Sequence, residues 1–175
     1  MLSLISIRAI LGLILIGMGI QDFKFRAISW YLFPLLTGCL LLINPSFSIN
    51  ACLINLGFIA FVFVLLTGWF SLREGSMVNL TQRHLGIGDI LFLLCLAFFF
   101  SPVNFFLFYL SSLLLVAIGT GLYLILAKPE NFSIPLAGLQ GLVLIVMLTA
   151  GWIWNIDISN TDFLPDFLFN AYERG

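Results

Sequence analysis

Residues 105–127 read FFLFYLSSLLLVAIGTGLYLILA and contain no charged side chain. A helix that crosses the hydrocarbon core of a bilayer needs about 20 consecutive apolar residues, so this stretch by itself predicts a membrane span. The bilayer core offers no water to backbone N–H and C=O groups, and the stretch lacks the alternation of β-barrel strands. We therefore expect it to be an α-helix.

The remainder of the chain is also strongly hydrophobic and poor in charged residues. Hydrophobic residues make up 62% of the 175 residues and charged residues only 9%, with a mean hydropathy of +1.17, whereas an average soluble domain has about 25% charged residues. Five further apolar runs occupy residues 2–20, 29–43, 51–70, 86–101 and 134–154. We predict an all-α, polytopic integral membrane protein with about six transmembrane helices in residues 1–154. Residues 155–175 form a short acidic and aromatic tail, which suits a segment resting at the membrane interface.

Composition also excludes several classes of function. The net charge is −1 and no basic block is present, so we expect no nucleic-acid partner, because such binding relies on neutralising phosphates. The cysteines lie inside apolar runs without the Cys-x-x-Cys spacing of redox and zinc motifs: Cys39, Cys52 and Cys95. We interpret them as packing residues and expect neither a metal nor another cofactor. Membrane lipids are the partners that the composition implies.

The distribution of basic residues predicts the orientation in the membrane. With six spans, one side carries five basic residues between the apolar runs, namely Lys24, Arg26, Arg73, Arg83 and Lys128. The two connections on the other side, residues 44–50 and 101–104, carry none. Lysine and arginine accumulate on the cytoplasmic side of short connections. We therefore predict a multi-pass protein of the cell (inner) membrane with both termini outside.

Two acidic residues on the predicted cytoplasmic side differ from the others. Asp22 closes the first apolar run and Asp89 opens the fourth, whereas Glu74 and Glu130 stand in polar connections. An ionisable side chain at membrane depth costs roughly 2.5–3.5 kcal/mol, which makes it a candidate functional residue. Two spans separate the aspartates, so both return to one side, and they would meet if the first and fourth helices pack together. The alternative is that each aspartate only caps a helix end at the interface.

A pair of aspartates has a known chemistry. Two carboxylates held close together do not both ionise at neutral pH, so the pair shares one proton, as in the aspartic-protease dyad. The ionised member accepts a proton from the attacking water, and the protonated member donates to the developing oxyanion and then to the leaving nitrogen. Gly86 and Gly88 precede Asp89 and would allow backbone or substrate to approach its carboxylate.

Three motifs together resemble a known family. Residues 19–28 (GIQDFKFRAI), 84–89 (HLGIGD) and 134–139 (IPLAGL) are similar, in order and topology, to signatures of the type IV prepilin peptidases, intramembrane aspartyl proteases with a Gly-x-Gly-Asp motif. The resemblance covers most of the chain. It implies that Asp22 and Asp89 are the catalytic pair. It also implies a substrate: a pilin-like precursor with a short basic leader and an apolar helix, cleaved at the cytoplasmic membrane boundary.

The chain also departs from the pattern of that family. Ser29 follows Ile28 where the family usually has proline, and residues 90–93 lack the polar or basic residue that often follows the second aspartate. The cysteine-rich cytoplasmic region of bifunctional members is missing, so the resemblance is to the short, peptidase-only forms. Two other functions stay open: a small proton-coupled transporter that uses the same aspartates, and a non-catalytic membrane assembly factor of the same fold.

Three further expectations concern loops and small residues. We expect residues 71–85 to form a mobile loop that helps to admit the substrate. His84, the only histidine, lies in this loop, and we interpret it as loop polarity rather than as a metal ligand. Small residues in the last two apolar runs would permit close helix packing: Gly119, Thr120, Gly121, Gly138 and Gly141.

Overall fold

Six α-helices make up the part of the chain that the computed structural model describes, which is residues 4–44, 47–75, 86–127, 135–154 and 156–159. They are α1 (Leu4–Phe25), α2 (Leu32–Ile43), α3 (Ile49–Glu74), α5 (Ile87–Ala97), α6 (Pro102–Ala127) and α7 (Leu136–Trp154). The prediction of an all-α fold is confirmed for these residues.

The six helices fall into two length classes. Four of them are long and apolar enough to cross a membrane, namely α1, α3, α6 and α7. The other two, α2 and α5, have 12 and 11 residues, or roughly 18 and 17 Å at 1.5 Å per residue, against about 30 Å for a bilayer core. The six predicted spans are therefore four long apolar helices and two shorter ones.

The helix ends differ from the predicted boundaries in two places that matter for the site. The first helix continues past residue 20 to Phe25, so Asp22 belongs to its last turn. The third helix continues to Glu74, where Gly75 ends it with φ 65°. Glu74 is therefore helical, and the prediction of a loop over residues 71–85 is wrong for residues 71–74. Residues 76–85, including His84, lie outside the described residues.

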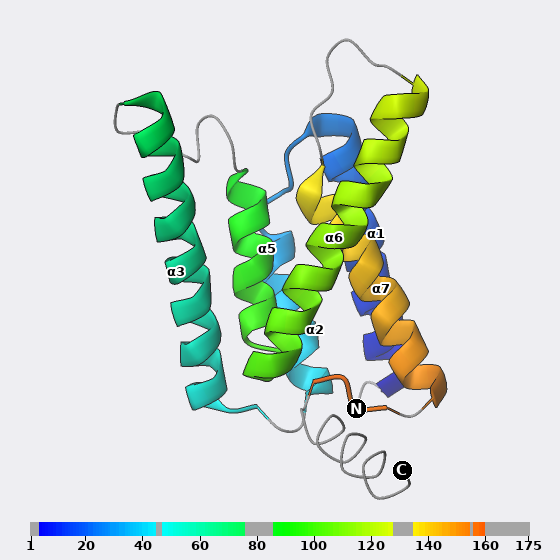
Figure 1. Cartoon of the computed structure of the whole chain (residues 1–175). Helices are drawn as coiled ribbons and strands as arrows, with labels where there is room; N and C mark the ends of the chain where they lie inside the picture. Colours follow the sequence, from blue (N-terminus) through cyan, green and yellow to red (C-terminus); the bar gives the residue numbers. More distant parts are fainter. Residues whose placement is uncertain (1–3, 45–46, 76–85, 128–134, 155, 160–175) are drawn as a thin grey trace, which may run out of the picture.

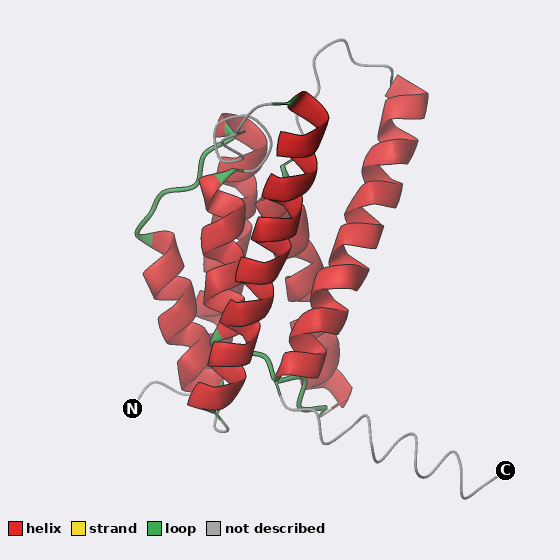
Figure 2. Cartoon of the chain, turned by 60° about the vertical axis from the view of Figure 1, so that its left-hand side comes forward, coloured by secondary structure: helices red, strands yellow, loops and turns green. Residues whose placement is uncertain are grey.

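The helices form one bundle, in which α6 packs against α7 and α3 (Figures 1 and 2). The main neighbours of α1 are α7 and α2, and α5 packs against α2, α3 and α7. The α3 helix stands at the edge of the bundle in Figure 1, beside α5, and it is the least buried of the four long helices. The starts of α5 and α7 lie below the upper ends of α3 and α6 in the same view. This end of the bundle is called the site end below.

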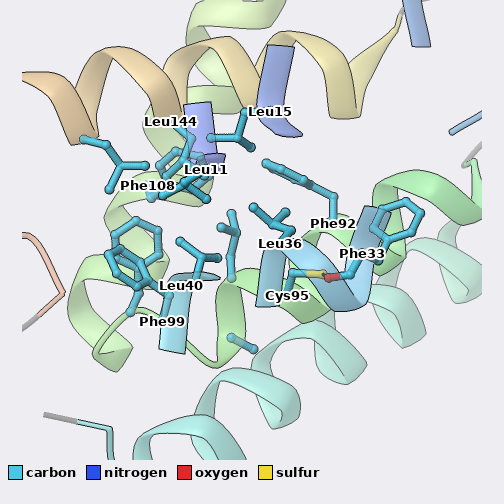
Figure 3. Packing of buried hydrophobic residues seen from close by; sticks show 14 of the residues in the cluster. Leu11, Leu15, Phe33, Leu36, Leu40, Phe92, Cys95, Phe99, Phe108 and Leu144 are labelled. Carbon is cyan, nitrogen blue, oxygen red and sulfur yellow. Dashed lines mark hydrogen bonds between the residues drawn. The ribbon is translucent and has the colours of Figure 1, made fainter. Parts of the chain in front are cut away.

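A single apolar core joins five of the helices. Figure 3 shows Leu11, Leu15, Leu36 and Leu40 facing Phe92 and Leu144 in its centre. Each of these six side chains is at most 1% exposed. Burying a large aliphatic or aromatic side chain stabilises a fold by roughly 1.5–3 kcal/mol in water, and packing supplies the attraction within lipid. The core therefore fixes α1, α2, α5 and α7 relative to one another.

Small residues bring α1 and α7 together at the site end. A Cβ atom at Gly138 would lie 3.4 Å from Gly19 Cα and 3.1 Å from the Asp22 side chain, and one at Gly141 would lie 4.0 Å from Leu15. The prediction of close packing is therefore confirmed for Gly138. It is wrong for two glycines of α6, because a Cβ atom at Gly119 or Gly121 would contact no other helix within 4 Å in the described part of the chain.

The opposite end of the bundle, called the far end below, is held by neutral polar side chains. Asn55 Nδ2 donates to the carbonyl oxygens of Ala97 and Phe100 at 3.1 and 2.8 Å, and Asn44 Nδ2 donates to Phe99 O at 2.9 Å. These carbonyls belong to the end of α5 and the turn after it, where helical partners run out. The first residues of the predicted tail join this network, since Ser101 N donates to Ser159 O at 2.8 Å.

The described part of the tail also accounts for one of its acidic residues. Asp157 Oδ1 accepts hydrogen bonds from the backbone N–H and the hydroxyl of Ser159, at 2.9 and 2.6 Å. The Asp157 carboxylate therefore stabilises a local turn. The rest of the predicted interfacial tail, residues 160–175, lies outside the described residues.

Candidate active site

Asp22 and Asp89 come from helices that are not main packing partners. Asp22 lies in the last turn of α1, and Asp89 lies in the first turn of α5. The expectation that these two helices pack directly against each other is not met, because α1 packs mainly against α7 and α2, and α5 packs against α2, α3 and α7. The two aspartates meet instead at the first turn of α7.

Two adjacent backbone amides of α7 bind the two carboxylates. Gly138 N donates to Asp22 Oδ2 at 2.7 Å, and Ala137 N donates to Asp89 Oδ1 at 2.8 Å. These partners are 116 and 48 residues apart in the sequence. The first turn of α7 thus holds one carboxylate from each of two other helices at neighbouring positions.

The sequence around residue 135 explains why α7 accepts these side chains. The first N–H groups of a helix have no partner within the helix, and a preceding Ser, Thr, Asp or Asn usually binds them. Pro135 stands directly before α7 and has no side-chain acceptor. The amides of Ala137 and Gly138 are therefore available, and the positive end of the helix favours negatively charged acceptors.

The site is sheltered and its charges interact. Asp22 is 9% exposed, and Asp89 is half-buried. The carboxylate of Asp22 is close enough for its charge to act on that of Asp89. One oxygen of each carboxylate is held by α7, which keeps the two groups in this sheltered place.

The two motif glycines have separate roles. Gly86 N donates to Asp89 Oδ2 at 3.1 Å, so it fixes the second oxygen of that carboxylate. A Cβ atom at Gly88 would lie 3.6 Å from the Ile28 side chain, which is an ordinary van der Waals contact. Gly86 therefore holds the carboxylate, while Gly88 lies beside the segment that follows α1.

The segment after Asp22 is held in place by Gln21. Its Oε1 atom accepts a hydrogen bond from Ser29 N at 2.8 Å, across eight residues. Arg26 ends α1 with φ 54°, a left-handed conformation that residues with a side chain adopt uncommonly. The chain thus turns sharply four residues after Asp22, and Gln21 ties the returning segment to the aspartate's own helix.

Sequence reasoning identified the two carboxylates but missed the groups that hold them. The α7 amides carry no side-chain signature, because any residue except proline offers the same N–H. Two signals were present: Pro135 marked a helix start without a cap, and Gly138 marked a position without a side chain. Gln21 directly precedes Asp22, and only the fold shows that it binds Ser29.

No protein-family model, no curated protein and no solved structure matches the chain.

Proposed function

We propose that this chain is an intramembrane aspartyl endopeptidase that uses Asp22 and Asp89 as its catalytic pair. The observation that supports it most is the convergence of these two carboxylates, from different helices, on adjacent amides of α7. A shared proton between two carboxylates supplies both the base and the acid that peptide hydrolysis needs. The resemblance to the type IV prepilin peptidases, carried by the same residues, points to the same reaction.

The reaction follows from the pair acting as one unit. The ionised carboxylate removes a proton from a water molecule, whose oxygen attacks the carbonyl carbon of the scissile peptide. The protonated carboxylate donates its proton to the carbonyl oxygen as charge develops there. When the C–N bond breaks, the carboxyl group that took a proton from water passes it to the leaving nitrogen, and the proton on the former carbonyl oxygen returns to the other carboxylate. The α7 amides of Ala137 and Gly138 keep both carboxylates oriented through these steps, since they hold one oxygen of each.

The proposed substrate is a pilin-like precursor with a short basic leader and an apolar helix. In this proposal all six helices lie in the membrane, with the site end on the cytoplasmic side, where the basic residues of the connections accumulate. The short α5 and the late start of α7 support this arrangement, because both helices begin below the upper ends of α3 and α6 (Figure 1). In such a precursor the leader meets the apolar helix at the membrane boundary, which is where this arrangement puts the site end.

The direct test is cleavage of a synthetic precursor by the purified chain in liposomes. The expected product has one cut between leader and apolar helix. In isotopically labelled water its new carboxyl group carries one labelled oxygen, because water attacks the peptide directly. Asp157→Asn is the matched control, since it alters a carboxylate at the far end. Cleavage that Asp22→Asn leaves unchanged would contradict the proposal.

One observation favours a second function, that of a non-catalytic assembly factor. Both carboxylates cap the start of α7, which is a structural task in itself. Asparagine keeps a carbonyl oxygen that can accept the same N–H bond, whereas alanine does not, and losing a cap costs about 0.5–2 kcal/mol. For an assembly factor, Asp22→Asn preserves both folding and cellular function. For a peptidase it preserves folding alone.

A further inference from the structure

A cavity of about 270 Å³ lies between α3, α5, α6 and α7. Aromatic and branched aliphatic side chains form most of its wall, including Phe58, Val62, Phe63, Leu93 and Phe105. An apolar protein cavity of about 150 Å³ is large enough to bind benzene. This cavity therefore has room for one aromatic ring and the group that carries it, but it is smaller than typical drug-sized pockets of about 300–1,000 Å³.

One residue that lines the same cavity, Gln140, has a buried polar atom without a partner among the described residues. Gln140 on α7 is 0% exposed, and its Nε2 atom donates to Ser112 Oγ at 3.2 Å. Its Oε1 atom is buried and has no hydrogen-bond partner among the described residues. Most buried polar atoms are paired, and an exception calls for a physical explanation. A donor brought in by a ligand supplies one.

The cavity is continuous with the candidate active site. Asp89 lines it together with Gln140. Along α7, Gln140 lies about one turn after Ala137, whose N–H binds Asp89. A ligand that extends from Asp89 along α7 into the cavity therefore brings its apolar part toward Gln140.

We propose that this cavity binds one large apolar group carrying a single hydrogen-bond donor, and that Gln140 Oε1 accepts the hydrogen bond from that donor. The identity of the ligand rests on the proposed function: it is the first large apolar residue of the precursor on the membrane side of the cleaved bond. The donor is the peptide N–H of that residue or a polar hydrogen of its ring. A lipid acyl chain has no donor and leaves Oε1 unpaired.

Two small probes test the cavity without any substrate. The purified chain in detergent is titrated with p-cresol and with toluene, which differ by one hydroxyl group. Binding is followed by ligand-observed NMR, with partitioning into empty micelles subtracted. We expect p-cresol to bind at least about tenfold more tightly than toluene. A ligand whose hydroxyl donates to a buried acceptor binds much more tightly than an analogue that lacks the hydroxyl.

Gln140→Leu removes the acceptor while keeping a similar volume. The preference for p-cresol should disappear in this variant, with toluene binding unchanged or stronger. Thr149→Val is the matched control on α7, because Thr149 is exposed and binds only backbone carbonyls of its own helix. An equal preference for p-cresol in wild type and Gln140→Leu would overturn the role of Gln140.

A second pair of variants tests where the probes bind. Val62 faces the cavity, whereas Val64 on the same helix is 67% exposed. Val62→Phe should fill the cavity and abolish binding of both probes, and Val64→Phe should leave binding intact. Unchanged binding in Val62→Phe would overturn the cavity as the site. The Gln140→Leu comparison keeps the test decisive if Val62→Phe does not fold.

Cleavage measurements separate this inference from the proposed function. If the precursor occupies the cavity, Val62→Phe should raise KM by at least about tenfold, and Val64→Phe should not. Unchanged KM together with loss of probe binding would overturn the precursor as the ligand. Absence of any cleavage by the wild-type chain, with the p-cresol preference intact, would overturn the proposed function and support the cavity site.

Discussion

The two ends of the bundle use opposite chemistry for the same structural task. At the far end, Asn44 and Asn55 donate hydrogen bonds to carbonyl groups at the end of α5 and in the turn after it. At the site end, Asp22 and Asp89 accept hydrogen bonds from the start of α7. The far end satisfies a helix terminus with neutral amides, whereas the site end employs two carboxylates.

This difference shows where the fold carries more charge than its stability requires. Asn, Ser and Asp are about equally good caps for a helix start, so a neutral residue would serve α7 as well. Two carboxylates at adjacent amides add mutual repulsion and the expense of charge near the membrane. A catalytic pair needs these two ionisable carboxyl groups, whereas a helix cap does not. Variants at the two ends should therefore differ in their effects on cleavage and on stability.

The largest expected effect outside the aspartates comes from Gly138→Ala. The added methyl group would lie 3.1 Å from Asp22 Cβ and Oδ2, so the carboxylate has to move. We expect cleavage to fall by about 10²-fold, since a displacement of about 1 Å is enough for such a loss. Gly141→Ala is the control, because its methyl group would meet only Leu15, at 4.0 Å. Wild-type cleavage by Gly138→Ala would show that α7 does not position Asp22.

At the far end, Asn55→Leu should affect stability instead of catalysis. It leaves the carbonyl groups of Ala97 and Phe100 without their donor. We expect a loss of about 2 kcal/mol in the free energy of unfolding, with kcat of the folded protein unchanged. Thermal unfolding and cleavage are measured on the same preparation. Thr67→Val is the control on α3, because the Thr67 hydroxyl donates to Phe63 O of its own helix. A loss of kcat without a loss of stability would contradict the proposal that the far end serves stability and the site end serves catalysis.

A smaller effect is expected from Gln21→Leu. This variant removes the acceptor for Ser29 N and frees the segment after α1 without touching either carboxylate. Cleavage should fall about tenfold, and Gln21→Glu, which keeps an acceptor, should recover most of it. Steady-state kinetics on the three proteins check this. Equal cleavage rates in all three proteins would show that Gln21 does not position the site.

The smallest effects are expected from Gly119→Ala and Gly121→Ala in α6. Among the described residues, a Cβ added at either position meets no atom within 4 Å outside its chain neighbours and the nearby backbone of α6, and alanine favours helix more than glycine. Stability should stay equal or rise by less than about 1 kcal/mol, with cleavage unchanged. A clear loss of stability in thermal unfolding would indicate a contact of α6 beyond those that the described residues make.

Much of this architecture followed from the sequence because hydrophobicity determines it. Long uncharged runs marked α3, α6 and α7, and the rarity of charge made Asp22 and Asp89 stand out. The ends of the helices were harder to predict from the sequence, because polar residues such as Arg73 and Glu74 extend α3 beyond its apolar run. The contacts with α7 were hidden for another reason. A backbone N–H is the same at nearly every residue, so only the packing of α1 on α7 shows which one Asp22 meets.

The most direct measurement of the central claim is the cleavage rate of Asp22→Asn, Asp89→Asn and the double variant, with thermal stability followed in parallel. We predict that each single variant loses about 10²–10⁴-fold in rate while it keeps its fold. The double variant should be about as inactive as either single one, because residues that act as a unit are not additive. Wild-type rates in either single variant, or activity lost only in step with folding, would contradict the claim that the two carboxylates form one catalytic unit.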